Sequence, residues 1–242
     1  PGTTGSRTPG NHPDHSGQND LMVLVQDTAQ RFWMNDINWG YRFGDLVYIN
    51  HPKCASTYYS SLLAANQWTP IKFSEIQWGK DYVFGFAMDP WIKHAKAITE
   101  DLWSRHRENL GTILDLGPTF FQDLGLFGCH SMPLWVRLQH HMYQVHWIPL
   151  DLRQISSDTL LEHLLNHHGC SLDLGNINRH ESQPEKLSLF KQVREMLDKG
   201  SAIIWQVLAQ DLDLYNQIRD SVNPYGSNWT EMYQYVPQDN YK

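Results

Sequence analysis

Residues 46–57 read Leu-Val-Tyr-Ile-Asn-His-Pro-Lys-Cys-Ala-Ser-Thr. The first four residues form an unbroken apolar run of strand length, which is typical of a strand covered on both faces in a parallel sheet. Pro52 cannot donate to a sheet ladder, so it ends the strand. A helix is predicted to begin directly after the turn, because Tyr58, Leu62 and Leu63 follow at helical spacing.

The turn within this stretch is predicted to bind an anion. The first backbone amides of a helix lack partners within the helix, so they favour a phosphate or a sulfate. Lys53 adds a positive charge beside them, and Ser56 or Thr57 is expected to cap the helix. An ordinary strand-to-helix turn with a surface lysine is the alternative interpretation of the same residues.

The composition of the turn points to one class of anion-binding loop. It lacks the glycine run and the Gly-Lys-Ser/Thr ending of the common phosphate loop of nucleotide hydrolases. It instead resembles the 5'-phosphosulfate loop of the carbohydrate-type sulfotransferases, which use 3'-phosphoadenosine 5'-phosphosulfate (PAPS). The resemblance implies PAPS as co-substrate and adenosine 3',5'-bisphosphate as product. The PAPS-binding loop residues that it implies are Pro52, Lys53, Cys54, Ala55, Ser56 and Thr57.

A second match departs from the family at two positions. The family's second strand ends in Arg-Asp-Pro, and the arginine holds the 3'-phosphate together with a serine about eight residues further on. Here Asp89-Pro90 is present, but Met88 stands in place of the arginine and Lys96 in place of the serine. Lys96 and Lys93, on the same side of the predicted helix, are candidate replacements. Both lysines fit a solvated helix surface equally well.

Three weaker similarities follow in the family's order. Residues 130–133, His-Ser-Met-Pro, are similar to its His-x-x-Pro element. Residues 178–182 are similar to its Asn-x-Ser loop, and 211–215 to its acidic and aromatic helix near the C-terminus. Each is short, so the resemblance rests on their order and on the first loop.

The order of the predicted elements favours an α/β fold. Strands alternate with helices, and the chain is expected to form a P-loop-like three-layer fold with a mostly parallel central sheet flanked by helices. Residues 1–19 are predicted to be a disordered lead and 20–242 a single sulfotransferase-like domain. Residues 35–44 are expected to form a turn that leads into the first strand. Residues 111–128 are expected to form an irregular lid or rim, and 219–242 an extended tail. The predicted strands are 46–49, 82–87 and 142–150, and the predicted helices are 21–34, 56–66, 90–102, 156–168, 184–199 and 202–218.

Composition and charge argue against several classes of partner. The formal charge of −7 is unfavourable for a broad basic face that binds nucleic acid or a heavily sulfated polysaccharide. No apolar run of about 18 residues and no signal-peptide layout occurs, so no membrane span is expected. Three cysteines favour a reducing, cytoplasmic location, with the Golgi lumen as the alternative if the chain is a truncated ectodomain. No metal site is expected, because His163 and His167 lack a third ligand.

The resemblance implies transfer of a sulfuryl group from PAPS to a hydroxyl or amine of a glycan or small molecule. Lys53 is expected to neutralise charge on the departing phosphate while the loop holds the other oxygens. His130 is the first candidate for the base, and His51 the second, because imidazole titrates near neutral pH. Two alternatives remain open: a non-catalytic binding module on a sulfotransferase fold, and an atypical nucleotide-dependent phosphotransferase. Acceptor identity and oligomeric state are not determined by the sequence.

Overall fold

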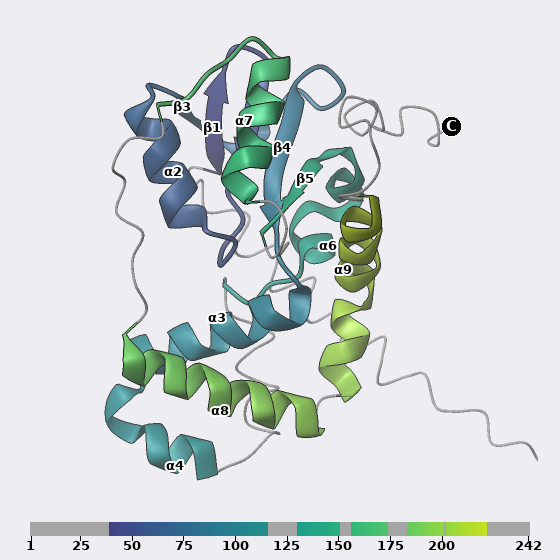
Figure 1. The fold of residues 1–242 in the computed structure, drawn as a ribbon. Helices are drawn as coiled ribbons and strands as arrows, with labels where there is room; N and C mark the ends of the chain where they lie inside the picture. Colours follow the sequence, from purple (N-terminus) through teal and green to yellow (C-terminus); the bar gives the residue numbers. More distant parts are fainter. Residues whose placement is uncertain (1–38, 116–129, 151–155, 174–182, 201, 222–242) are drawn as a thin grey trace, which may run out of the picture.

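A computed structural model describes residues 39–115, 130–150, 156–173, 183–200 and 202–221 (Figure 1). These residues form an α/β fold with a five-stranded open sheet and seven α-helices, which confirms the α/β prediction. The strand order is β3-β1-β2-β4-β5. Two of the neighbouring pairs are parallel and two are antiparallel, so the sheet is mixed and the prediction of a mostly parallel sheet is not confirmed.

The centre of the sheet consists of the two strands that the sequence predicts most clearly. β2 (Leu46–Ile49) and β4 (Tyr82–Ala87) have the predicted bounds and pair in parallel. β5 (His146–Pro149) pairs in parallel with β4 but is shorter than the predicted 142–150. The difference arises because Gln139–Gln144 forms a 3-10 helix, which leaves only the last part of the alternating stretch extended. Ladder pairing thus begins at His146.

Two antiparallel strands at one edge are absent from the prediction. β1 (Gly40–Phe43) lies between β2 and β3 (Thr69–Ile71), and pairs antiparallel with both. The expectation that 35–44 is only a turn is therefore wrong for residues 40–43. β1 is half exposed, and β3 has three residues including a proline, which a sheet tolerates at its edge. Neither has an apolar pattern of its own, so pairing decides their conformation: β1 pairs with β2, and β3 pairs with β1.

Helices cover both faces of the sheet. α2 (Ser56–Ala65) and α7 (Ser157–His167) pack on one face, and α6 (Leu134–Leu138) and α9 (Ala202–Ser221) pack on the other (Figure 1). Successive strand residues point to opposite faces, so each strand supplies both cores. The first core includes Leu46, Tyr48, Tyr59, Phe84, Phe86 and Leu161, and the second includes Val47, Ile49, Val83, Trp135, Trp147 and Val207.

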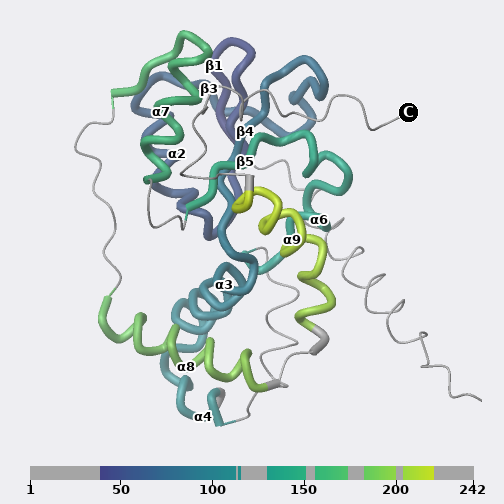
Figure 2. The backbone as a smooth tube through the Cα atoms, turned by 45° about the vertical axis from the view of Figure 1, so that its right-hand side comes forward, coloured from purple at the N-terminus to yellow at the C-terminus, as the bar shows by residue number. Residues whose placement is uncertain are grey.

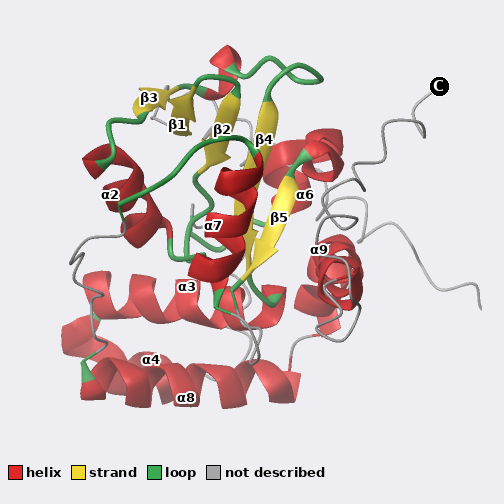
Figure 3. Ribbon diagram, turned by 45° about the horizontal axis from the view of Figure 1, so that its top comes forward, coloured by secondary structure: helices red, strands yellow, loops and turns green. Residues whose placement is uncertain are grey.

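A further group of helices lies beyond the carboxyl ends of the parallel strands. α3 (Pro90–Arg105) follows β4 directly, and α8 (Pro184–Gly200) runs beside it, with α4 (Leu110–Asp115) next to them (Figures 2 and 3). α3 begins as predicted, because Asp89 accepts hydrogen bonds from the amides of Trp91 and Ile92 at 2.9 and 3.1 Å. α3, α8 and the start of α9 bury a third apolar cluster between them.

The remaining helix predictions agree with the structure to within a few residues. α7 begins after Ser156, whose hydroxyl accepts from the amide of Thr159, and α8 and α9 correspond to the predicted 184–199 and 202–218. α4 occupies the start of the predicted rim. The lead at 1–19, the predicted helix 21–34, most of the rim, the element at 178–182 and most of the tail lie outside the described residues. None of the helices in the described ranges is long and apolar enough to cross a membrane.

Candidate functional site

The predicted anion loop connects β2 to α2 at the carboxyl edge of the sheet. Lys53 has a φ of 64° and Ala55 a φ of 53°, so two residues that are not glycine adopt the left-handed conformation within three positions. Each such residue costs on the order of 1 to 3 kcal/mol, and such strain is concentrated at functional sites. The amide of Cys54 donates to the carbonyl of His51 at 3.1 Å, which closes the turn.

The start of α2 differs from the expected cap. Ala55 occupies the position before the helix, and no side chain caps it, so the prediction that Ser56 or Thr57 is the cap is wrong. Ser56 and Thr57 lie in the first turn instead. An alternation of left-handed and ordinary residues directs successive amides into one concavity, which is the backbone geometry of anion-binding loops. The helix amides remain oriented toward this loop.

Lys53 lies in a cluster of charges drawn from three segments of the chain. Its Nζ is 3.1 Å from Oε2 of Glu100 on α3, and Nζ of Lys186 on α8 is 2.5 Å from the same oxygen. The side chain of Lys53 is 19% exposed, so the amine is held against the protein rather than extended into solvent. Burial raises the pKa of Glu100, but the hydrogen bonds and charges of Lys186 and Lys53 outweigh it and lower that pKa.

The two lysines proposed to replace the 3'-phosphate ligands differ in environment. Lys93 is 4% exposed, and its Nζ donates to the carbonyl of Met132 at 2.6 Å. Burial lowers the pKa of Lys93. Lys96 is exposed on the same helix, and Met88 packs at the edge of the first core. The structure therefore does not bring the two amines together at the surface.

His130, the first candidate base, is held near α3. Its Nδ1 is 3.7 Å from Oδ1 of Asp101, and its side chain is 38% exposed. Asp101 follows Glu100 in the chain, so α3 contributes neighbouring carboxylates to Lys53 and to His130. Lys53 and His130, the predicted lysine and the predicted base, therefore both lie beside α3. Spacing in the sequence could not show that they share this helix.

Asp211 joins two of the weaker sequence elements. Its carboxylate, on α9, is buried and accepts from the amides of Leu134 and Trp135 at 2.6 and 2.9 Å, which caps α6. Pro133 precedes them and has no amide proton to offer. Burial raises the pKa of Asp211 to about 6, although the charge of Lys93 and the two amides oppose the shift. The segment 130–135 is thereby fixed to α9.

Replacing Asp211 by Asn is expected to reduce the free energy of unfolding by about 2 to 3 kcal/mol, because one backbone amide of α6 loses a charged acceptor in the interior. Chemical denaturation at pH 7.5 measures the change. Asp213→Asn, at an exposed position of the same helix, is the matched control and is expected to change stability by less than about 0.5 kcal/mol. Equal stability of the two variants would contradict the capping role.

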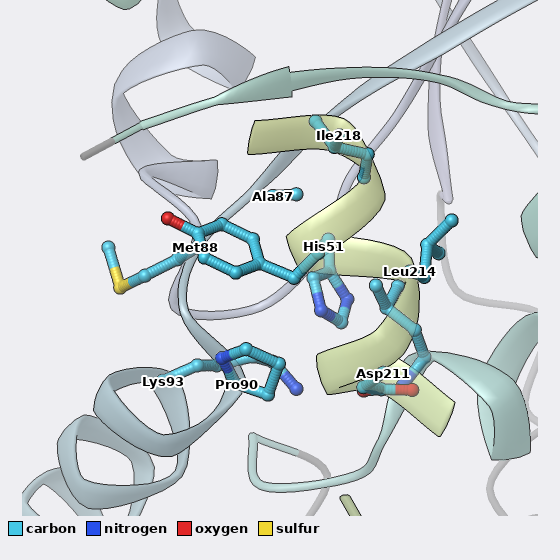
Figure 4. Close-up of a pocket in the computed structure, with 10 residues that line it drawn as sticks. His51, Ala87, Met88, Pro90, Lys93, Asp211, Leu214 and Ile218 are labelled. Atoms are coloured by element: carbon cyan, nitrogen blue, oxygen red, sulfur yellow. The ribbon is translucent and has the colours of Figure 1, made fainter. Parts of the chain in front are cut away.

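A small cleft with a mostly apolar lining lies beside the loop (Figure 4). His51, Lys93 and Asp211 point toward one another there, and Met88 and Leu214 form part of its apolar wall. The cleft measures about 250 Å³ with its open mouth, and its interior has room for about one water molecule. Nε2 of His51 is buried and has no hydrogen-bond partner among the described residues. Burial, then the charges of Lys93 and Arg137, lower the pKa of His51 well below its usual value, so the ring is uncharged near neutral pH.

Some of the site could be found from sequence and some could not. Lys53 and His51 are accessible to sequence reasoning because they stand in a recognisable loop, and His130 because it opens the His-Ser-Met-Pro element. Glu100 and Lys186 are missed, because their role depends on the packing of α3 against α8. The only sequence signal is the spacing of Lys96 and Glu100, which places a charge pair on one helix side. Within the described residues, no group of three or more histidine, cysteine, aspartate and glutamate side chains could hold a metal ion.

Comparisons with protein-family profiles, with curated proteins and with solved structures find no match to this chain.

Proposed function

We propose that this protein is a PAPS-dependent sulfotransferase that moves a sulfuryl group to a hydroxyl or amine of a small molecule or glycan. The observation that carries the proposal is the loop between β2 and α2. It combines a lysine, two strained left-handed residues and the start of a helix at the carboxyl edge of two parallel strands. Ligands of open α/β sheets bind at this edge.

In the proposed reaction, the acceptor oxygen attacks the sulfur of PAPS in line with the departing phosphate. A new S–O bond forms, the old one breaks, and adenosine 3',5'-bisphosphate leaves with the electron pair. Lys53 neutralises the charge that develops on its 5'-phosphate, and the amides of the loop hold the other oxygens. The protein's contribution to this reaction is to position the reactants and to stabilise the charge that develops.

Two histidines are candidates to take the acceptor proton. His130 is half exposed beside Asp101, whose carboxylate can stabilise the imidazolium. His51 is buried, and its Nε2 has no hydrogen-bond partner among the described residues, but its strongly lowered pKa makes it the weaker base and the adjoining cleft has room for only about one water molecule.

A non-catalytic binding module on the same fold is the second candidate. Met88 supports it, because a thioether cannot replace the arginine that binds the 3'-phosphate in the family. Burial of Lys93 against the carbonyl of Met132 adds to that support, since this amine is already engaged. The phosphotransferase alternative has less support, because Asp89, the carboxylate that follows β4 near the loop, caps α3 instead of being available to magnesium.

Titration calorimetry with adenosine 3',5'-bisphosphate in the presence of EDTA tests the proposal, with magnesium-ATP as the competing ligand. Metal-independent binding of the bisphosphate that weakens at least tenfold in Lys53→Met supports a sulfotransferase site. Preference for magnesium-ATP would identify a phosphotransferase. Binding of neither ligand would refute the proposal and favour the non-catalytic binding module.

A further inference from the structure

One carboxylate oxygen is held between two ammonium groups at the proposed donor site. Oε2 of Glu100 contacts Nζ of Lys186 at 2.5 Å and Nζ of Lys53 at 3.1 Å. The three side chains come from α8, α3 and the loop after β2, and each is between 19% and 31% exposed. A hydrogen bond from Lys186 to this oxygen accompanies the ion pair.

Two ammonium groups around one oxygen are the surroundings expected of a bound phosphate or sulfate. Two lysines from different elements converge on a single oxygen, and the packing of α3 against α8 holds them there. The two amines and the one carboxylate carry a net positive charge, so the cluster retains attraction for a second anion. A phosphate or sulfate group offers more charge and more acceptor oxygens than a carboxylate, so it can displace Glu100 from both amines.

We infer that Lys186 is a second cation of the donor site and that Glu100 is an internal competitor that occupies the place of one anionic group of the donor. The ligand class is a pyrophosphate-like dianion, and its identification with PAPS rests on the proposed function. Binding transfers Lys53 and Lys186 from Glu100 to the ligand. In the unliganded protein, Glu100 keeps the two amines close together. It also lowers the affinity for the anionic ligand, because the ligand must displace it.

The inference predicts opposite effects for two changes within one ion cluster. Glu100→Gln should tighten the binding of the anion about tenfold, because the competitor loses its charge while its amide oxygen can still accept from a lysine. Lys186→Met should weaken binding about tenfold, since one charge-assisted hydrogen bond to the ligand is lost. A purely structural salt bridge predicts no gain of affinity in Glu100→Gln.

Calorimetry of the full chain with inorganic pyrophosphate and with adenosine 3',5'-bisphosphate, at constant ionic strength, tests these effects. Glu185→Gln and Lys191→Met are the matched controls, because both are exposed charges of α8 that change the net charge by the same amounts. Both controls are expected to change the Kd less than twofold, since exposed charges are screened by salt. Thermal melting of each variant checks that the fold is retained.

The outcomes separate this inference from the proposed function. Pyrophosphate binding that responds as predicted, without preference for the adenosine bisphosphate, supports the two-lysine site and refutes the sulfotransferase. Adenosine bisphosphate binding that depends on Lys53 but is unchanged in Glu100→Gln and Lys186→Met supports the sulfotransferase and overturns the inference. Controls that change the Kd as much as the cluster variants would also overturn it, because the effect would then be one of net charge alone.

Discussion

Replacing Lys53 by Met is expected to reduce the rate of the proposed sulfuryl transfer from PAPS by about 10²- to 10³-fold, the usual cost of removing one group that stabilises transition-state charge. Met keeps the length and the apolar stem of the side chain, so the loop between β2 and α2 is retained. The ion pair with Glu100 is partly exposed, and Lys186 still pairs with that carboxylate. The free energy of unfolding should therefore fall by less than about 1 kcal/mol.

Transfer of a labelled sulfuryl group to a panel of acceptors, followed by thermal melting, measures both quantities. Lys80→Met is the control, because Lys80 is exposed in the turn before β4 and lies outside the loop. Full activity in Lys53→Met would refute the role assigned to this amine. A large loss of melting temperature together with activity would instead make Lys53 a structural residue.

The second large effect is expected on acidification. His94, on α3, is 1% exposed, and burial followed by the charge of Lys93 lowers its pKa to about 3. Burial and the charge of His168 lower the pKa of His146 to about 4. The unfolded chain takes up these protons below about pH 6.5, whereas the folded protein does not. The stability contributed by the neutral rings is thus complete above pH 6.5 and is lost as pH falls toward the folded pKa values.

Each of the two histidines contributes a loss of about 1.4 kcal/mol per pH unit below pH 6.5. Asp211 acts in the opposite direction, since its raised pKa of about 6 favours the folded state as pH falls from 6 toward 3.8. Its opposing contribution is on the order of 2 kcal/mol at pH 4.5. These three groups together are expected to give a net loss of about 3 kcal/mol between pH 7 and pH 4.5, a large part of the stability of an ordinary domain. His51 adds to the loss, because burial also lowers its pKa well below the usual value.

Chemical denaturation at half-unit pH intervals measures this slope, and His94→Leu isolates one residue. Leu has no group to protonate and fills a comparable volume, so stability at pH 7.5 should stay within about 1.5 kcal/mol of the parent. Between pH 6 and 4.5 the variant should lose about 1.4 kcal/mol less per pH unit than the parent. Parallel pH profiles for parent and variant would show that His94 has the same pKa in the folded and the unfolded protein, which would contradict its burial as a neutral ring.

The elements that the sequence predicts well are those whose own residues decide their conformation. β2 and β4 are apolar runs of strand length between turn residues, and α3 begins at an aspartate followed by a proline, so local chemistry sets their bounds. β1 and β3 lack such signals; β1 becomes a strand because β2 offers a free ladder edge, and β3 because β1 then offers the next one. The predicted parallel sheet becomes mixed for this reason.

The candidate site divides in the same way. The loop at 50–57 is visible in the sequence, because a strand, a proline, a lysine and a helix start follow one another without a gap. The environments of Lys93 and Asp211 are not visible, because their partners, Met132 and the amides of α6, are 39 and more than 70 residues away in the chain. Burial turns these charged residues from surface candidates into interior hydrogen-bonding groups.

The sequence by itself determined the class of fold, the two central parallel strands and the position of one lysine at the start of a helix, because these features depend on periodicity and on residues adjacent in the chain. Only the tertiary structure decided that this lysine shares Glu100 with Lys186, that the sheet is mixed and that Asp211 caps α6. The physical reason is that charge pairing, strand pairing and capping across the fold depend on distances in space, which helix and sheet packing sets and which sequence spacing does not record.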